Sequence, residues 1–327
     1  MNIVVTGGAG YIGSHMVYRL IEEGHNVIII DSLITGFKEL LHPKAKFVLS
    51  DIRDVEQLRN VLHKEKIEAI FHFAGLVKVE ESITQPLNYY ANNTFGTQCL
   101  LEAIKLSPLV KYFIFSSTAA VYGDTTSELV TENNSTEPIN PYGHSKLMGE
   151  QILKDFAASY SKLSYTILRY FNVAGAHPTA GIGPRHQNAT HLIKVAAETA
   201  IGKRAELSIF GNDYPTPDGT CVRDYIHVMD LVSAHLKALQ YLQAGKTSDT
   251  FNLGYGQGHS VKSVLEMMAQ VSDKNLPVRL AARRPGDSAS VVADSKKAQK
   301  NLEWTPEWND LQKICSTAFL WESKLLK

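Results

Sequence analysis

Short apolar runs alternate with amphipathic stretches from residue 1 to about residue 170. An uninterrupted apolar run fits a strand that is buried on both faces, and apolar positions at helical spacing fit the helices that cover such a sheet. The apolar runs predict strands at residues 3–6, 27–31, 47–49, 69–73, 112–116 and 165–170. The stretches between them predict helices at residues 12–23, 55–64, 86–105 and 141–160. This alternation indicates an α/β fold with a Rossmann doubly wound parallel sheet.

The rhythm changes after Arg169-Tyr170-Phe171-Asn172. A segment rich in Gly, Pro and His follows at residues 175–186 and predicts an irregular loop, after which the elements become shorter and less regular. We expect a nucleotide-binding domain at residues 1–172 and a smaller mixed α/β substrate domain at residues 173–327. Within the second part, the segment around residues 223–243 is expected to pack back on the first domain.

A glycine-rich loop stands at the first crossing from strand to helix. Strand 3–6 leads into Gly7-Gly8-Ala9-Gly10-Tyr11-Ile12-Gly13, and Asp31 ends the second strand. Glycines permit a tight turn and close approach of a pyrophosphate, whose charge is favoured at a helix N-terminus. An acidic residue at the end of the second strand can accept the ribose hydroxyls of adenosine and repel the extra phosphate of NADP. Taken alone, the loop could be a turn that binds no ligand, and Asp31 could simply favour a turn. The two features together predict NAD binding.

Three residues form a candidate acid–base group. Asn140-Pro141 is a helix start, so Tyr142 and Lys146 lie one turn apart on the same helix face. A nearby ammonium favours a phenolate, which predicts a pKa of Tyr142 lowered towards neutrality. Thr118 follows the fifth strand, at the sheet edge where such folds bind ligands, and its hydroxyl could relay the substrate proton to Tyr142. Each feature alone is also found in purely structural settings, so the prediction depends on all three.

The composition of the chain indicates which kinds of binding partner are not expected. Lys plus Arg and Asp plus Glu both total 33 among 327 residues, so no charged surface for nucleic acid is expected. The apolar runs are far shorter than the roughly 20 residues that span a bilayer, and no signal peptide precedes the first strand, so we expect a cytoplasmic protein without a membrane partner. Cys99, Cys221 and Cys315 are widely spaced and predict free thiols, and no spacing of metal ligands predicts a metal site.

These motifs lie within longer blocks that resemble the extended short-chain dehydrogenase/reductases, and among them the UDP-glucose 4-epimerases of the NAD-dependent epimerase/dehydratase family. The similarity covers nearly the whole chain. Its blocks are TGGAGYIGSH (6–15), DIRD (51–54), HFAG (72–75), SSTAAVYG (116–123), NPYGHSK (140–146), RYFNVAGAHP (169–178), FGNDYPTPDGTCVRDYIHV (210–228) and RRPGD (283–287).

The resemblance implies two sets of binding residues. The set implied for NAD is Gly7, Gly10, Tyr11, Ile12, Gly13, Asp31, Ser32, Leu33, Thr35, Gly36, Asp51, Ile52, Phe73, Ala74, Gly75, Val77, Asn92, Ser116, Tyr142, Lys146 and Phe171. The set implied for a UDP-hexose is Thr118, Tyr142, Asn172, His191, Leu192, Ser208, Ile209, Phe210, Arg223, Arg284, Asp287 and Val291. Two arginines can clamp a diphosphate through bidentate hydrogen bonds, although exposed arginines in ordinary salt bridges are the alternative.

The reaction that the resemblance implies belongs to galactose metabolism and interconverts UDP-galactose and UDP-glucose. Tyr142 removes the proton of the sugar 4-hydroxyl while hydride passes from C4 to bound NAD, and the 4-keto sugar then rotates and takes the hydride back on its other face. Related 4,6-dehydratases need a further acid and base next to the catalytic Ser or Thr. Here Ala119-Ala120-Val121 follow Thr118, and methyl groups transfer no protons. A non-catalytic NAD sensor would be expected to lack Tyr142 or Lys146.

Two positions depart from the usual family pattern. Val77 stands where many members have lysine, so one polar contact to NAD is expected to be missing or replaced, with the neighbouring Lys78 facing elsewhere. Val291 stands where members with a bulky tyrosine accept only plain hexoses and members with a small residue also accept N-acetyl sugars. We hypothesise that UDP-GlcNAc and UDP-GalNAc are substrates too; the alternative is that Val291 is a core residue.

The resemblance also implies a homodimer. In the family, the helices corresponding to residues 86–105 and 141–160 pack against their copies in a second subunit. The apolar residues on these helices fit such an interface and equally fit packing on the sheet. They are Leu100, Leu101, Ile104, Leu147, Ile152 and Phe156.

Overall fold

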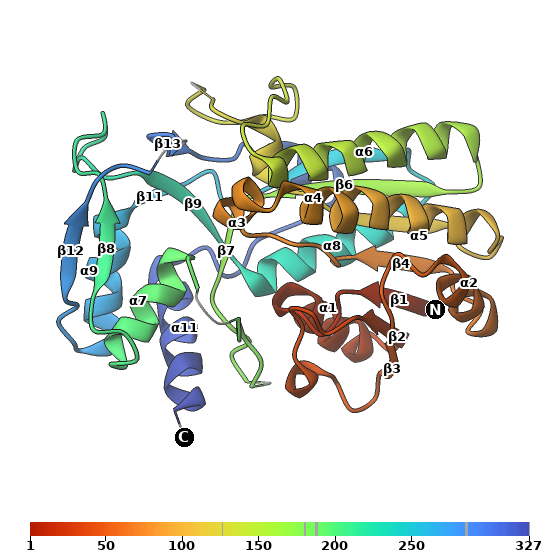
Figure 1. The fold of residues 1–327 in the computed structure, drawn as a ribbon, viewed down its shortest axis with the longest axis horizontal. Coiled ribbons are helices and arrows are strands. Elements are labelled where there is room, and N and C mark those ends of the chain that lie inside the picture. Colours follow the sequence, from red (N-terminus) through yellow and green to blue (C-terminus); the bar gives the residue numbers. More distant parts are fainter. Residues whose placement is uncertain (126, 180, 187–188, 285–286, 327) are drawn as a thin grey trace.

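A seven-stranded parallel sheet forms the larger part of the computed structural model, which describes residues 1–125, 127–179, 181–186, 189–284 and 287–326 (Figure 1). The strand order is β10-β6-β5-β4-β1-β2-β3. Six of the strands lie where the apolar runs predict them, to within one residue at either end: β1 (Asn2–Thr6), β2 (Asn26–Asp31), β3 (Lys46–Leu49), β4 (Ala69–His72), β5 (Tyr112–Ser116) and β6 (Ser164–Tyr170). The Rossmann prediction is confirmed.

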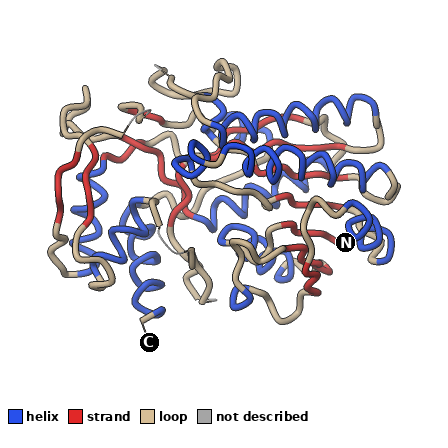
Figure 2. Tube along the Cα trace, viewed as in Figure 1, coloured by secondary structure: helices blue, strands red, loops and turns tan. Residues whose placement is uncertain are grey.

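Helices cover both faces of this sheet (Figure 2). α1 (Tyr11–Glu22) and α8 (Val228–Gln243) share one apolar cluster with Ile3 and Val5 of β1. α2 (Val55–Lys64), α5 (Gly96–Lys105) and α6 (Pro141–Ser159) share the other cluster with Val4. Successive β1 side chains thus enter opposite cores, which explains why Ile3, Val4 and Val5 are all apolar.

The predicted helix at residues 86–105 is interrupted. α3 (Val79–Thr84) and α4 (Pro86–Tyr89) precede a π-helical segment, η2 (Tyr90–Phe95), before α5 begins. The buried Asn93 lies in η2 and binds groups outside its own helix. Single π-helical turns recur where a helix must direct a side chain to a functional site.

The seventh strand, β10 (Asp249–Leu253), was not expected. It comes from the C-terminal half of the chain and pairs in parallel with β6 at the edge of the sheet. Its sequence, Asp-Thr-Phe-Asn-Leu, lacks the apolar run that marks the central strands, and only Phe251 and Leu253 join the large core. An edge strand needs less apolar surface, so its signal in the sequence is weaker.

The smaller part is mixed α/β, as predicted. β7 (Asn172–Ala174), β9 (Val222–His227), β11 (Gly258–Ser260) and β13 (Ser290–Val291) form one sheet, and β8 (Leu207–Phe210) pairs with β12 (Val278–Ala281). α7 (Leu192–Ala200), α9 (Val261–Ser272) and α11 (Leu311–Leu325) pack around an apolar core of their own, and the short α10 (Lys296–Asn301) follows β13. β7 begins two residues after β6 ends, so the chain passes directly from the large sheet into the small one.

Candidate active site

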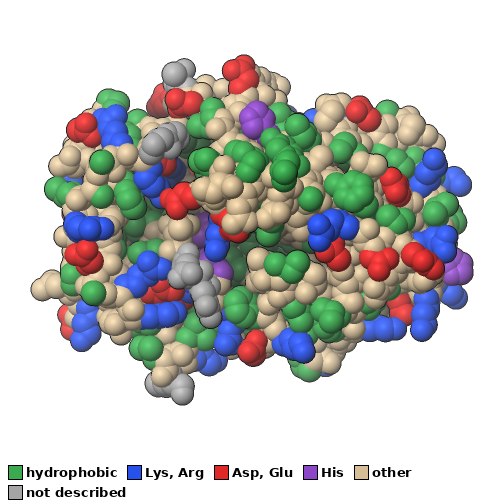
Figure 3. All heavy atoms as spheres, viewed as in Figure 1, with side chains coloured by type: hydrophobic (Ala, Val, Ile, Leu, Met, Phe, Trp, Pro, Cys, Tyr) green, Lys and Arg blue, Asp and Glu red, His purple; other side chains and the backbone are tan. Residues whose placement is uncertain are grey.

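The carboxyl ends of β1, β4 and β5 are neighbours in the sheet. The register pairs Thr6 with His72, and His72 with Phe115. The loops that follow these strands therefore emerge side by side, at the edge where open α/β sheets bind ligands. Figure 3 shows the surface hollowed where the large and small parts meet, with charged and histidine side chains at its walls.

The glycine loop is packed tightly against the end of β4. Gly7 has φ +71°, and a Cβ there would lie 2.6 Å from the backbone nitrogen of Ala74. Gly10 caps α1 without a side chain, and the first turn of α1 carries no acidic residue. The first N–H groups of α1 thus have no side-chain acceptor, which fits the binding of a pyrophosphate.

Asp31 is fixed beside this loop. Its Oδ2 accepts the N–H of Ala9 at 3.0 Å and its Oδ1 accepts the N–H of Leu33 at 2.8 Å. Burial raises the pKa of Asp31, and these two hydrogen bonds oppose the rise. Each carboxylate oxygen keeps a free lone pair, so the side chain is oriented to accept ribose hydroxyls. Ser32, Thr35 and Gly36 continue the same turn, and a Cβ at Gly36 would lie 2.7 Å from Asp31 Oδ1.

The remaining residues expected around NAD follow β3, β4 and β6. Asp51 accepts hydrogen bonds from the Arg53 side chain, which lowers the pKa of Asp51. Ile52 is buried, Phe73 to Gly75 leave the end of β4, and Phe171 is buried between β6 and β7. Val77 is 54% exposed, and the ammonium of Lys78 lies 4.0 Å from Glu81.

Sequence reasoning missed Asn93 and His235, which hold other site residues in place. Asn93 Nδ2 donates to Ser145 Oγ on α6 and to the carbonyl of Leu76, each at 3.0 Å. The adjacent Asn92, which was expected to contact NAD, donates to Asn93 Oδ1. His235 on α8 must donate its Nδ1–H to a carbonyl, so its Nε2 accepts from Ser116 Oγ at 2.8 Å. For Asn93 the available signal was a polar residue within the helix predicted at residues 86–105, and for His235 no helix had been predicted.

The three acid–base residues lie on α6 and directly after β5. Asn140 Oδ1 accepts the N–H of Gly143 at 2.9 Å, which confirms the predicted helix start before Tyr142. Tyr142 and Lys146 are both buried, and the Tyr142 side chain shares a hydrogen bond with Thr118. Thr118 directly follows the Ser116-Ser117 end of β5. The sheet edge and the start of α6 therefore bring the hydroxyls of Tyr142 and Thr118 together, with Lys146 one turn further along the helix.

The predicted lowering of the Tyr142 pKa is wrong for the chain alone. Burial raises the pKa of Tyr142, and the Thr118 hydrogen bond opposes this only in part. Burial also lowers the pKa of Lys146 to about 8, against the effect of Glu150, so this ammonium is itself destabilised. The sequence argument counted the attraction between the two groups but not the loss of water around both.

The residues expected to hold the diphosphate form one wall. Asp287 lies 3.6 Å from Arg223 Nη2 and 2.8 Å from Arg284 Nε. The Arg284 guanidinium stands over the Phe210 ring, 4.7 Å from its centroid. Pro285 and Gly286 of the RRPGD block lie outside the described residues. Asp287 thus pairs with both arginines, and the Phe210 ring also supports Arg284.

Other residues expected around the sugar lie in the same lobe. Asn172 donates to the carbonyl of Asp224, and His191 is exposed at the start of α7, followed by Leu192. Along β8 the side chains alternate, so Ser208 and Phe210 share a face while Ile209 is buried in the core beneath α7. Only the backbone of Ile209 can therefore face a ligand.

A Rossmann sheet with a glycine loop, Asp31 and a Tyr142–Lys146–Thr118 group defines an NAD-dependent enzyme of the short-chain dehydrogenase/reductase type. The model of the NAD dependent epimerase/dehydratase family matches residues 3–254. The chain belongs to this family.

Individual relatives agree. UDP-glucose 4-epimerase of Streptococcus mutans is 46% identical over 100% of this chain and 98% of its own length. The structure of UDP-glucose-4-epimerase from Stenotrophomonas maltophila, with bound NAD and formylated UDP-arabinopyranose, has a TM-score of 0.96 at 41% identity, covering 100% and 99% of the two chains. The UDP-Glc/GlcNAc 4-epimerase of Campylobacter jejuni has a TM-score of 0.87 at 45% identity, covering 99% of each.

Among the described residues, no helix has both the length and the apolar character required to cross a membrane.

Replacing Lys146 with methionine should stabilise the protein at neutral pH. The Lys146 pKa of about 8 lies below its ordinary 10.5, so burial of the ammonium destabilises the fold fully below pH 8, and this cost disappears as the pH rises to 10.5. We expect Lys146→Met to raise the free energy of unfolding at pH 7 by about 1–3 kcal/mol, measured by urea denaturation. The exposed Lys105→Met is the matched control and should change little. A less stable Lys146→Met protein at pH 7 would contradict the argument.

Proposed function

We propose that the protein interconverts UDP-galactose and UDP-glucose by inverting the configuration at sugar C4. The observation that carries this proposal is the position of the hydrogen-bonded Tyr142–Thr118 pair and Lys146 at the carboxyl edge of a Rossmann sheet. The wall of Arg223, Arg284 and Asp287 in the smaller part suits the diphosphate of a nucleotide sugar.

NAD binding is assigned to the part formed by residues 1–172, with α8 and β10 added to it. The start of α1 would hold the pyrophosphate and Asp31 the adenosine ribose. The remainder of residues 173–327 would hold the UDP-sugar. When bound, NAD would supply the acceptor and then the donor of the C4 hydride.

Side chains of the protein then carry out the transfer of the proton of the sugar 4-hydroxyl. Tyr142 takes the proton of the sugar 4-hydroxyl, Thr118 holds the same oxygen, and the Lys146 ammonium stabilises the phenolate. Arg223, Arg284 and Asp287 hold the diphosphate while the 4-keto sugar rotates. Tyr142 returns the proton once the sugar presents the opposite face of C4 to the cofactor. Ala119 and Ala120 next to Thr118 can transfer no proton, which argues against elimination of water.

Replacing Tyr142 with phenylalanine tests this assignment. Purified protein is incubated with UDP-galactose, with and without added NAD, and UDP-glucose is followed. We expect turnover by the wild type and a fall in kcat of about 10²–10⁴-fold in Tyr142→Phe, with NAD still bound. Tyr160→Phe, at the far end of α6, is the control and should keep its activity.

Undiminished turnover in Tyr142→Phe would overturn the mechanism. Absence of conversion by the wild type, even with NAD, would overturn the function; stoichiometric binding without turnover would instead indicate an NAD sensor.

We further propose that the sugar pocket accepts N-acetylated hexoses. Val291 pairs with Arg223 between β13 and β9, and its side chain packs partly buried against a cluster that contains Phe171 and Ala119. A small side chain thus neighbours both Arg223 of the proposed diphosphate wall and Ala119 beside Thr118. The C. jejuni relative is named for activity on both UDP-Glc and UDP-GlcNAc.

Replacing Val291 with tyrosine should narrow the substrate range. We expect kcat/KM for UDP-GalNAc and UDP-GlcNAc to fall by at least about tenfold, because the larger ring occupies the space for the acetyl group, while UDP-galactose turnover changes little. Both substrate pairs are assayed at equal concentration. No detectable turnover of UDP-GlcNAc by the wild type at millimolar concentration would contradict the proposal.

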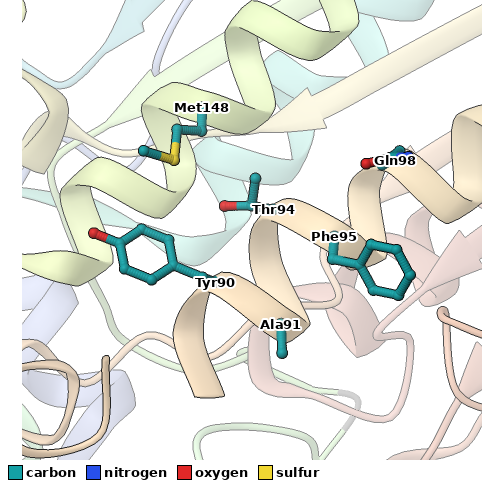
Figure 4. A pocket seen from close by; sticks show the side chains of 6 residues that line it. All are labelled: Tyr90, Ala91, Thr94, Phe95, Gln98 and Met148. Carbon is teal, nitrogen blue, oxygen red and sulfur yellow. The ribbon is translucent and has the colours of Figure 1, made fainter. Parts of the chain in front are cut away.

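We also propose a homodimer, through surfaces other than the residues first considered. Leu100, Leu101 and Ile104 are buried against the large sheet, with Ile152 and Phe156 partly buried beside them, and Leu147 joins the cluster around Phe171. These side chains are thus already packed within the subunit. A shallow hollow remains on the outer face of η2, α5 and α6, where Phe95 is 50% and Met148 45% exposed (Figure 4). Its lining residues are Tyr90, Ala91, Thr94, Phe95, Gln98 and Met148.

Replacing Phe95 with glutamate should weaken this dimer. We expect light scattering to give twice the 36.2 kDa chain mass for the wild type, and a concentration-dependent shift towards the monomer for Phe95→Glu, because a charge would be buried at the interface. Leu280→Glu, on the exposed β12, is the control and should remain dimeric. A monomeric wild type would contradict the proposal.

The expected location is the cytoplasm. Cys99, Cys221 and Cys315 are all buried and free, which suits a reducing compartment.

A further inference from the structure

Glu150 is fully buried, and the mechanism above gives it no role. It lies on α6, one turn beyond Lys146. Its Oε1 accepts the hydroxyl of Ser117 at 2.5 Å and Arg169 Nε at 2.9 Å, and its Oε2 accepts Arg169 Nη2 at 2.5 Å. Arg169, on β6, is also buried. Three strong donors thus converge on one carboxylate inside the protein.

A buried ion pair of this kind is a poor source of stability. Removing two charges from water costs about as much as their attraction returns, and a well-packed apolar pair often serves equally well. The position of Glu150 points to another reason for its presence. It contacts the residue before Thr118 and lies one helical turn from Lys146.

The same network holds both ends of the segment that carries Thr118. Ser117 is bound by Glu150 at one end. At the other end, Arg169 Nη1 donates to the Tyr122 hydroxyl at 3.0 Å, and that hydroxyl donates to Asn252 Oδ1 at 2.7 Å. Thr118 lies between these two anchors, which hold its backbone, while its own hydroxyl accepts the N–H of Ala120 at 3.1 Å.

Charge links Glu150 to Lys146. Burial lowers the pKa of Lys146 to about 8, and the nearby carboxylate of Glu150 opposes this change. His72 on β4 also faces Lys146, but burial lowers its pKa to about 3, so it is neutral at physiological pH, with its ring nitrogens bound to Thr6 and Thr97. Glu150 is therefore the anionic group that sustains the ammonium.

The surroundings contain few other charges. The titratable or charged groups that face Lys146, Glu150 or Tyr142 from the packed elements are His72, Tyr89, Lys154, Tyr165, Arg169 and Tyr170. Lys154 lies 3.8 Å from Glu150 and is exposed to solvent, so water screens it. The tyrosines are neutral at physiological pH, because the pKa of each is raised.

We propose that Glu150 is a positioning residue for the epimerisation: through Ser117 it places Thr118, and through its charge it keeps Lys146 in the ammonium form that Tyr142 requires. This inference rests on the proposed function. Glu150 touches none of the residues assigned to NAD or the UDP-sugar by a hydrogen bond, so its effect should appear in kcat and its pH dependence rather than in KM.

The test is the pH profile of kcat for UDP-galactose in Glu150→Gln. Without the carboxylate, Lys146 loses its proton more easily, so the alkaline limb should move to lower pH by about one unit. Any limb that reports Tyr142, which lies two turns from Glu150, should move less. KM should stay within about threefold of the wild-type value.

Matched variants separate charge from structure. Glu150→Asp keeps the charge and should keep the alkaline limb near its wild-type position. Ser117→Ala removes the hydrogen bond alone and should lower kcat without moving that limb. Glu150→Gln/Arg169→Met removes both buried charges, so the fold is no longer left with an unpaired arginine; its alkaline limb should remain shifted.

The outcomes are distinct. An alkaline limb at the wild-type position in Glu150→Gln overturns the inference while leaving the proposed function intact. If Glu150→Gln alone does not fold, as judged by circular dichroism, a wild-type profile in the double variant overturns it instead. Absence of epimerisation by the wild type in the same assay is a failure of the proposed function, and is recognised before any variant is compared.

Discussion

The burial of a lysine ammonium at the end of a parallel sheet is the constraint on which the rest of the site depends. Lys146 lies over the ring of Phe115, with Nζ 4.4 Å from the ring centroid, and has lost nearly all contact with water. An ammonium in such a place is unstable unless another group compensates it. α6 provides that group one turn later as Glu150, and β6 provides Arg169 to satisfy Glu150 in turn. The charges alternate from the site into the core, so each is matched by the next.

This chain of charges explains why the acid–base group needs the whole Rossmann part. Lys146 and Glu150 come from α6, Ser117 from the end of β5 and Arg169 from β6, while Tyr122 is fixed by Asn252 of β10. Displacing one of these elements would leave a buried polar group without its partner, which costs more than the contact gains. The seventh strand, although it comes from the C-terminal half, thus supports the same segment that carries Thr118.

The sequence was sufficient for features that arise from local pattern. Continuous apolar runs located the first six strands, and Asn140-Pro141 located the start of α6, because burial on both faces and helix capping leave signatures within a few residues. Features that depend on distant packing were not accessible. β10 carries no strong apolar run, and the interruption at η2 is tied to the contacts of Asn93 across the fold. The burial of the Ile209 side chain follows from the register of its strand. The predicted direction of the Tyr142 pKa shift was also wrong, since the shift depends on how far folding removes water from the hydroxyl.

The arginine wall follows a different principle from the buried lysine. Arg223 and Arg284 share Asp287, so a diphosphate bound there, as proposed above, would compete with a carboxylate that is already in place. This competition reduces affinity, yet it holds both guanidinium groups in one orientation and lowers the entropy lost when the ligand binds. A reaction in which the sugar must rotate inside the pocket benefits from such an arrangement. The orientation of the two guanidinium groups would position the diphosphate without requiring very high affinity. Tight binding of the sugar itself would oppose the rotation on which inversion at C4 depends.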